Sequence, residues 1–281
     1  MKKITLALLA TATLVFAKTF TFTAIPDQDE TQLKERFSLF ANHLSKELDM
    51  EVKFIPVKSY SASIAAFRNN QVQLAWFGGL SGVKARLAVP GSVAIAQGVE
   101  DPNFHSFIIA NTNTGIQKSK TIPKEIAGRN FTFGSKGSTS GRLMPEYFIT
   151  KTFGKSPNEV FSKVGFSGNH SKTIALVQSG AYEVGATNYK VWKRELKAGK
   201  IDPSKVKIVY QTPGYPDYNF SVRGDLDKQF GKGFTKRLQQ AIINIKDKKV
   251  LGAFPRSGFI KATNADFKPV LDTARKLGLV D

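Results

Sequence analysis

The sequence of 281 residues contains no cysteine and only three histidines. The absence of cysteine excludes disulfides, thiolate metal sites and thiol nucleophiles. The H-E-x-x-H and G-x-S-x-G motifs are also absent, so the common zinc-protease and serine-hydrolase signatures are missing. The most phosphate-like segment, 134–141, lacks the lysine and hydroxyl ending of a P-loop. Together these absences give an enzyme little support.

Acidic residues are scarce beside basic ones: 22 Asp and Glu stand against 41 Lys and Arg, a formal charge of +19. Hydrophobic residues make up 41% of the chain, which is typical of a globular protein rather than a disordered one. Such a positive charge first suggests nucleic acid or another anionic surface as a partner. That interpretation predicts charge clustered on one face and binding that weakens steeply with salt.

Long hydrophobic runs are missing except at the N-terminus, where Lys2 and Lys3 precede the uncharged segment 4–16. Val15 and Ala17 then occupy the −3 and −1 positions of a cleavage site, which predicts a signal peptide over residues 1–17. The alternative is a buried first strand or helix. The run is short for a membrane span, so we expect an exported, soluble chain that meets no cytoplasmic nucleic acid.

The hydrophobic spacing predicts an α/β chain whose strands alternate with helices. Strands are expected at 19–25, 52–57, 72–77, 107–110, 129–133, 163–166, 182–186, 206–210 and 219–222. Helices are expected at 31–48, 60–69, 80–87, 143–153, 172–179, 190–197, 232–245 and 267–277. The first part therefore predicts a mostly parallel sheet covered by helices, and 111–119 a crossing segment. The strand–turn–helix unit recurs in a second block, which suggests two lobes.

Three predicted helix starts follow strands and carry polar residues. Ser138, Thr139 and Ser140 precede one helix, Tyr60 opens another, and His170 precedes a third. The first amides of a helix are unpaired and partly positive, so they bind oxyanions without a cationic side chain. A plain helix cap is the alternative, but it needs only one hydroxyl. Open α/β sheets bind ligands at such strand ends, which favours one shared site.

At these residues the chain resembles the periplasmic phosphonate/phosphite-type substrate-binding proteins of ABC transporters. Five blocks carry the resemblance over nearly the whole chain after the signal peptide: 60–78, 104–110, 137–141, 168–170 and 186–188. Their order and spacing are specific, although each block alone is weak. Within the family the chain most resembles the branch named for selenate binding, through segments 74–79 and 140–148.

The resemblance implies a type II periplasmic-binding-protein fold, which is α/β with two lobes and a ligand cleft between them. Lobe 1 would span 18–110 plus 215–281, and lobe 2 would span 111–214. It further implies a small oxyanion ligand, no cofactor, a monomer in the periplasm, and partners in the permease and ATPase of the transporter. The lobes would close on the ligand.

The resemblance also implies roles for individual residues. Tyr60 and His170 match residues that donate to the oxyanion, and Ser138, Thr139 and Ser140 match a cradle of hydroxyls and amides. Phe104 falls where phosphonate binders use a second tyrosine, and neighbouring His105 is the expected compensation. The predicted site thus comprises the following residues: Tyr60, Trp76, Phe104, His105, Ser138, Thr139, Ser140, His170, Asp217 and Tyr218.

Ligand selectivity follows from two further positions. Aminoalkyl-phosphonate binders hold the ligand's amine with two carboxylates, and here those positions align with Val191 and Tyr218. Since a buried ammonium without a carboxylate is costly, an aminoalkylphosphonate is not expected. No aligned residue is acidic, which favours a fully ionised dianion such as selenate or sulfate. A one-residue shift of the alignment would bring Asp217 into the cleft and weaken that preference.

Three alternatives remain open at this point. A hydrolase of phosphate or sulfate esters needs a nucleophile or a metal cluster, and the sequence shows neither. A ligand-sensing domain of the same fold would carry a fused transmembrane or signalling segment. A cationic surface-binding protein would use its charge for recognition, whereas none of the predicted ligand contacts is Lys or Arg.

Overall fold

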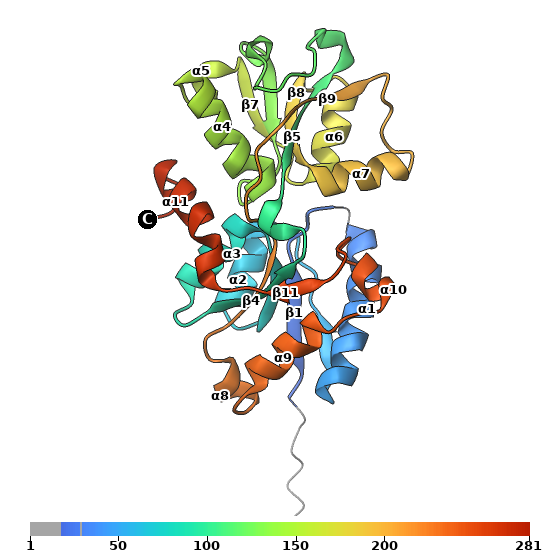
Figure 1. Cartoon of the computed structure of the whole chain (residues 1–281), viewed down its shortest axis with the longest axis vertical. Coiled ribbons are helices and arrows are strands. Elements are labelled where there is room, and N and C mark those ends of the chain that lie inside the picture. Colours follow the sequence, from blue (N-terminus) through green and yellow to red (C-terminus); the bar gives the residue numbers. More distant parts are fainter. Residues whose placement is uncertain (1–17, 29) are drawn as a thin grey trace, which may run out of the picture.

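The computed structural model describes residues 18–28 and 30–281, without the side chains of 30–32. The predicted signal peptide, 1–17, lies outside the described residues. The chain forms two α/β lobes stacked along its long axis, each built on its own sheet (Figure 1). No helix in the described part of the chain is long and apolar enough to cross a membrane.

Lobe 1 contains a six-stranded sheet in the order β11-β4-β10-β3-β1-β2. Its strands are β1 (Phe20–Ala24), β2 (Val52–Phe54), β3 (Leu74–Phe77), β4 (Val93–Gly98), β10 (Asn219–Val222) and β11 (Phe259–Lys261). Its helices are α1 (Glu30–Leu48), α2 (Tyr60–Arg68), α3 (Gly79–Ala88), α8 (Leu226–Phe230), α9 (Phe234–Ile243), α10 (Lys248–Gly252) and α11 (Lys268–Lys276). The carboxyl ends of the parallel strands β1, β2 and β3 point toward the second lobe, so α2, which follows β2, and α3, which follows β3, begin at the junction.

Phenylalanine fills the core of lobe 1 because alternate residues of β1 and one stripe of α1 face each other. Phe22 is fully buried, and its ring centroid lies 5.1 Å from that of Phe40 and 6.2 Å from that of Phe37. Both pairs meet edge to face, the arrangement that aromatic rings prefer. This packing fixes β1, and with it the loop that follows β1 into the junction.

Lobe 2 contains a five-stranded sheet in the order β7-β6-β8-β5-β9. Its strands are β5 (Ser106–Asn111), β6 (Asn130–Phe133), β7 (Lys163–Phe166), β8 (Val184–Asn188) and β9 (Val206–Gln211). Its helices are α4 (Met144–Phe153), α5 (Pro157–Val160), α6 (His170–Gln178) and α7 (Tyr189–Lys197). The carboxyl ends of β6, β7 and β8 face lobe 1, so α4, α6 and α7 begin at the junction, opposite α2 and α3.

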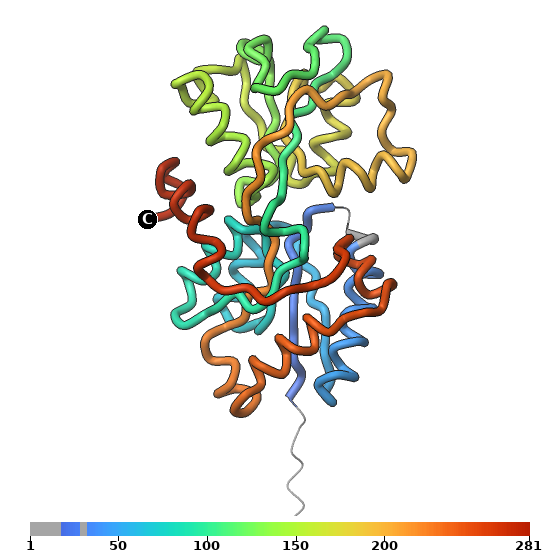
Figure 2. The backbone as a smooth tube through the Cα atoms, in the orientation of Figure 1, coloured from blue at the N-terminus to red at the C-terminus, as the bar shows by residue number. Residues whose placement is uncertain are grey.

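Two segments of the chain pass side by side between the lobes (Figure 2). They pair at Phe104 and Tyr215, where each backbone N–H donates to the other's carbonyl at 2.8 and 3.0 Å. The first crossing therefore precedes β5, and β5 lies in the sheet of lobe 2. The predicted boundary at 110 and the predicted crossing at 111–119 were wrong, because a strand that enters a new lobe looks like any other buried strand.

Both sheets are mixed, so the prediction of a mostly parallel first sheet was also wrong. β1 pairs parallel with β2 and β3, but β10 returns from lobe 2 and inserts antiparallel between β3 and β4. Strands β4 and β11 were missed. The sequence of β4 has two alanines, a glutamine and a glycine beside only two β-branched residues and no aromatic one, and β11 has only three residues.

Candidate ligand-binding site

The segment 137–141 follows β6 and forms the floor of the site; we call it the anion cradle. Ser138 caps the helix, with its Oγ accepting the Gly141 N–H at 2.9 Å. Thr139–Leu143 then forms one π-helical turn that leads into α4. Because a helix leaves its first amides unpaired, the N–H groups of Thr139 and Ser140, which precede the bonded Gly141 N–H, are available to an anion. Ser138, Thr139 and Ser140 are all buried, as a cradle beneath a ligand requires.

The cradle is joined to lobe 1 through the start of α3. The Leu80 N–H donates to Thr139 Oγ1, and the Gly79 N–H donates to Asp217 Oδ1, both at 2.9 Å. A Cβ at Gly78 would lie 3.2 Å from Asp217 Oδ1 and 3.4 Å from Thr139 Oγ1. A helix start of lobe 1, the cradle of lobe 2 and the second crossing segment therefore meet at one point, and the lobes are closed on each other.

Tyr60, the first residue of α2, reaches the cradle from lobe 1. A Cβ at Gly137 would lie 3.1 Å from the Cβ of Tyr60, so the two backbones pass in contact. The Tyr60 hydroxyl is buried and makes no hydrogen bond within the described chain. Burial, reinforced by the charges of Asp27 and Asp217, raises the pKa of Tyr60 well above its usual value. Tyr60 is therefore a neutral O–H donor without a protein acceptor.

His170, the first residue of α6, lies on the other side of the cradle. A Cβ at Gly141 would lie 3.0 Å from both His170 Cε1 and Ser138 Oγ. His170 Nδ1 accepts the Asn188 N–H at 3.3 Å, so Nε2 carries the ring proton and is buried without a partner. Burial lowers the pKa of His170 to about 4, partly offset by Asp27. The neutral ring therefore presents one unused N–H donor.

Asp217 also lies in this site, in the second crossing segment. Only Oδ1 is bonded; Oδ2 is buried and has no partner among the described residues. Burial raises the pKa of Asp217 to about 7, although the hydrogen bond from the Gly79 N–H lowers it. The crossing segment turns Asp217 over the start of α3, which fits the alternative alignment that brings Asp217 into the cleft. That position weakens the preference for a fully ionised dianion.

Tyr218 and Trp76 form the wall beside these groups. Tyr218 Oη accepts from Asn188 Nδ2 at 3.0 Å and donates to Asp27 Oδ2 at 2.9 Å, which links lobe 2 to the loop after β1. The rings of Trp76 and Tyr218 stack with centroids 5.4 Å apart. Asp27 and Asn188 escaped the sequence prediction. Asn188 ends β8 and Asp27 lies in the loop after β1, so their position at the edge where ligands bind was the available signal.

Phe104 and His105 occupy the first crossing segment. Phe104 is fully buried, and its ring packs against the rings of Tyr189, Tyr215 and Tyr218. His105 Nδ1 lies 3.0 Å from the Thr212 carbonyl, and its ring meets that of Tyr189 edge to face. These contacts place His105 in the hinge, and its role as a substitute for a missing tyrosine stays a prediction.

Three buried polar atoms without partners thus surround the cradle: Tyr60 Oη, His170 Nε2 and Asp217 Oδ2. The first two are donors, and the third is an acceptor or a donor according to its proton. Within the described residues, no group of three or more His, Asp or Glu side chains is placed to hold a metal ion. The arrangement suits a small oxyanion that takes hydrogen bonds from neutral donors and shares one proton with a carboxylate.

Comparisons with known proteins also indicate a protein that binds an oxyanion. The family described as "ABC transporter, phosphonate, periplasmic substrate-binding protein" matches residues 22–267. A probable ABC transporter phosphite-binding protein of Prochlorococcus marinus, PhnD1, is 44% identical over 92% of this chain and 89% of its own length. The structure of PhnD1 in complex with methylphosphonate superposes with a TM-score of 0.89, covering 94% of this chain and 99% of that one.

A more distant relative, the phosphonates-binding periplasmic protein of Escherichia coli, is 25% identical over 71% of this chain and 59% of its own length. The selenate branch suggested by the sequence stays a prediction. The family match covers strands of both sheets and the whole candidate site. Members of this family have the two-lobe fold, are periplasmic and work with the permease and ATPase of an ABC transporter. The chain therefore belongs to the periplasmic substrate-binding proteins of phosphonate-type ABC transporters.

Proposed function

We propose that this protein captures phosphite, or a phosphonate as small as methylphosphonate, and delivers it unchanged to its permease. The observation that carries the proposal is the convergence of Tyr60 Oη, His170 Nε2 and Asp217 Oδ2 on the anion cradle, each buried and without a partner. Two neutral donors and one titratable carboxylate match a tetrahedral oxyanion that retains a proton. The phosphite name and the methylphosphonate complex of the 44% identical relative support the same ligand class.

The proton on Asp217 is the basis of selectivity. When Asp217 is ionised, Oδ2 accepts the O–H of a singly protonated phosphite or methylphosphonate. Sulfate and selenate carry no proton near neutral pH, so they bind only when Asp217 is itself protonated. If neither partner holds a proton, two negative charges meet in a buried site. Phosphorus oxyanions are therefore preferred over sulfate and selenate.

Aminoalkylphosphonates are disfavoured for a reason other than a missing carboxylate. Asp27 does line the space beside Tyr218, but Arg36, Lys190, Arg194 and Arg256 line it as well. An ammonium on the ligand would meet this excess of positive charge. The bond between Tyr218 and Asn188 also closes the wall across which an alkyl tail would extend.

Titration calorimetry over pH 6 to 9 tests this proposal with phosphite, methylphosphonate, sulfate, selenate and 2-aminoethylphosphonate. We expect phosphite and methylphosphonate to bind at least about 100-fold more tightly than sulfate and selenate at pH 8. Asp217→Asn should weaken phosphite binding at least tenfold. It should also remove the pH dependence of sulfate binding, since the amide N–H of asparagine does not titrate and donates at every pH. Asp225→Asn, a half-exposed acid in lobe 1, is the matched control.

Two results would overturn the proposal. Sulfate or selenate binding that is tight and independent of pH in the wild-type protein would show that Asp217 does not share a proton with the ligand. Tightest binding of 2-aminoethylphosphonate would show that the space beside Tyr218 accepts an ammonium.

A further inference from the structure

A second polar pocket lies between the lobes, on the far side of Tyr218 and Asp27 from the anion cradle. Its walls come from the loop after β1, from α1, from the segment after α10, and from the start of α7. Asp27, Gln28, Arg36 and Arg194 face this space, which we call the arginine pocket. Asp27 contacts His170 and Tyr218, whereas no hydrogen bond within the described residues joins Gln28, Arg36 or Arg194 to the anion cradle. The pocket therefore needs an explanation of its own.

Two guanidinium groups converge in the arginine pocket on a single neutral oxygen. Gln28 Oε1 accepts from Arg36 Nη1 at 2.6 Å and from Arg194 Nη1 at 2.5 Å. Arg36 also donates to the Ala253 carbonyl, whereas the remaining N–H groups of Arg194 make no hydrogen bond within the described residues. No ion pair joins either arginine to a carboxylate in the described part of the chain. Burial, with a contribution from the charge of Arg194, lowers the pKa of Arg36 to about 10.

The amide of Gln28 provides an independent sign of a missing ligand. Its oxygen must face the two guanidinium groups, which fixes its NH₂ group on the opposite side. That nitrogen is buried, in a side chain that is 3% exposed, and has no hydrogen-bond partner. A buried donor without an acceptor costs about 1–3 kcal/mol, so such groups are usually satisfied by a bound species.

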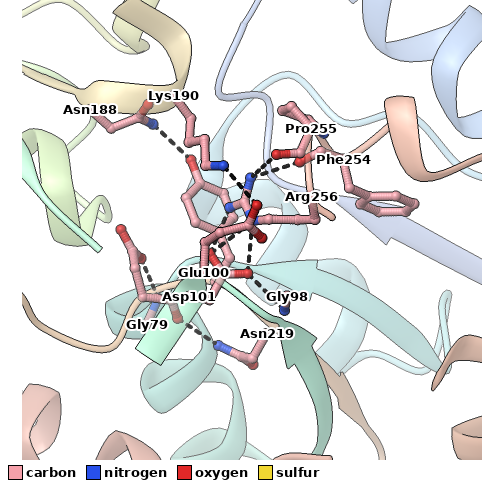
Figure 3. A network of polar contacts seen from close by, with 12 residues as sticks. Gly79, Gly98, Glu100, Asp101, Asn188, Lys190, Asn219, Phe254, Pro255 and Arg256 are labelled. Atoms are coloured by element: carbon pink, nitrogen blue, oxygen red, sulfur yellow. Dashed lines mark hydrogen bonds and ion pairs between the residues drawn. The ribbon is translucent and has the colours of Figure 1, made fainter. Parts of the chain in front are cut away.

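Among the described residues, the charges around the pocket leave one positive charge unbalanced. Arg256 pairs with Asp101 at 2.7 Å and Lys190 pairs with Glu100 at 3.1 Å, as Figure 3 shows. Arg36 and Arg194 then share only Asp27, whose Oδ2 already takes the Tyr218 hydroxyl. One monovalent anion would neutralise the pocket and accept from Gln28 Nε2 and the free N–H groups of Arg194. The space between the side chains has room for a single species of about the size of a water molecule.

From these observations we infer that the arginine pocket binds a second, small monovalent anion of halide size, distinct from the transported ligand. Gln28 and Arg36 belong to lobe 1 and Arg194 to lobe 2, so this anion site is complete only when the lobes are closed. A species that binds only the closed form stabilises it, and by linkage the transported ligand binds more tightly in its presence.

The affinity for methylphosphonate tests this inference when sodium chloride replaces sodium gluconate at constant ionic strength. Gluconate is too large for the pocket. We expect the Kd to fall about fivefold in 0.1 M chloride. Chloride competing at the cradle would raise the Kd instead, so the sign of the effect separates the two sites. Arg194→Met should abolish the chloride effect, while Lys193→Met, which removes a cation on the exposed face of the same helix, should preserve it.

Crystals of the wild-type protein grown in sodium bromide provide a second measurement that does not depend on a variant. We expect an anomalous peak within hydrogen-bond distance of Gln28 Nε2 and Arg194. A water molecule there, without anomalous signal, would overturn the inference, as would a Kd that is unchanged or raised by chloride. Because these outcomes leave the proton sharing of Asp217 untouched, they are distinguishable from failure of the proposed ligand.

Discussion

The anion cradle and the arginine pocket both lie beside Tyr218 but differ in their electrostatics. In the proposed site the anion is offered hydroxyls, helix amides and a neutral imidazole, and the pKa of the adjacent Asp217 is raised to about 7. The pocket instead concentrates permanent positive charge from Arg36 and Arg194 around one neutral oxygen. A chain with a formal charge of +19 thus keeps Lys and Arg away from the ligand it selects.

The difference teaches how one protein separates recognition from closure. Neutral donors with a titratable carboxylate discriminate among oxyanions by their protons, which a fixed cation does not do. Fixed cations on both sides of the junction repel each other, so an anion bound between them would favour the closed form whatever the transported ligand is. The predictions below test whether these tasks are in fact divided between the two regions.

The largest effect is expected from filling the cradle. In Gly141→Ala the new methyl group would lie 3.0 Å from His170 Cε1 and from Ser138 Oγ, which pushes the imidazole away from the ligand. We expect affinity for methylphosphonate to fall at least about 100-fold, because a donor to a charged group is misplaced. Calorimetry measures it. Gly252→Ala, where no heavy atom lies within 4 Å of the new Cβ, is the control.

If Gly141→Ala bound methylphosphonate with wild-type affinity, the cradle would not be the recognition element. Weakened binding in Gly252→Ala would point instead to a general loss of stability.

An intermediate effect is expected in the dependence of stability on pH, which should arise in the cradle and not in the arginine pocket. The pKa of Asp217 is raised in the folded protein, so its burial destabilises the fold increasingly as pH rises from about 4 to 7. The pKa of His170 is lowered to about 4, so its burial destabilises the fold as pH falls from 6.5 to 4. The two slopes oppose each other in the wild-type protein.

Removing one of the two groups should therefore expose the pH dependence of stability that the other contributes. Relative to wild type, the free energy of unfolding of Asp217→Asn should increase by on the order of 2 kcal/mol as pH rises from 4 to 7. That of His170→Gln should increase by a similar amount relative to wild type as pH falls over the same range. Urea unfolding of the ligand-free protein at pH 4.5, 5.5, 6.5 and 7.5 measures both. Variants whose curves run parallel to wild type at every pH would contradict the assignment of these groups.

The cradle was more predictable from the sequence than the pocket. Ser138, Thr139 and Ser140 are adjacent in sequence, and Tyr60 and His170 each lie at the start of a predicted helix, so local signals and a family resemblance were enough to predict a shared site there. Gln28, Arg36 and Arg194 carry no such signal. An arginine on a helix usually faces solvent, and only the closure of one lobe on the other brings α1 and α7 together.

The same distinction explains the errors in the fold. Helix and strand positions follow from local spacing, and most were predicted close to where they lie. The assignment of β5 to a lobe, the antiparallel insertion of β10 and the placement of Asp217 all depend on how the chain crosses between lobes twice. Such long-range decisions are made by the fit of one lobe to the other, which a hydrophobic pattern does not record.

The smallest effect is expected from the ion pair between Lys190 and Glu100, which spans the lobes at 3.1 Å beside the arginine pocket. The side chains are 19% and 28% exposed, so solvent screening limits the pair to about 0.5–1 kcal/mol. Lys190→Met should weaken methylphosphonate binding about two- to fivefold by destabilising the closed form, equally for every oxyanion and at every pH. A double-mutant cycle with Glu100→Gln isolates the pair, and adding salt should shrink the coupling. A change in the preference for phosphite over sulfate in Lys190→Met would instead mean that the cations of the junction take part in recognition, and the division between the two regions would fail.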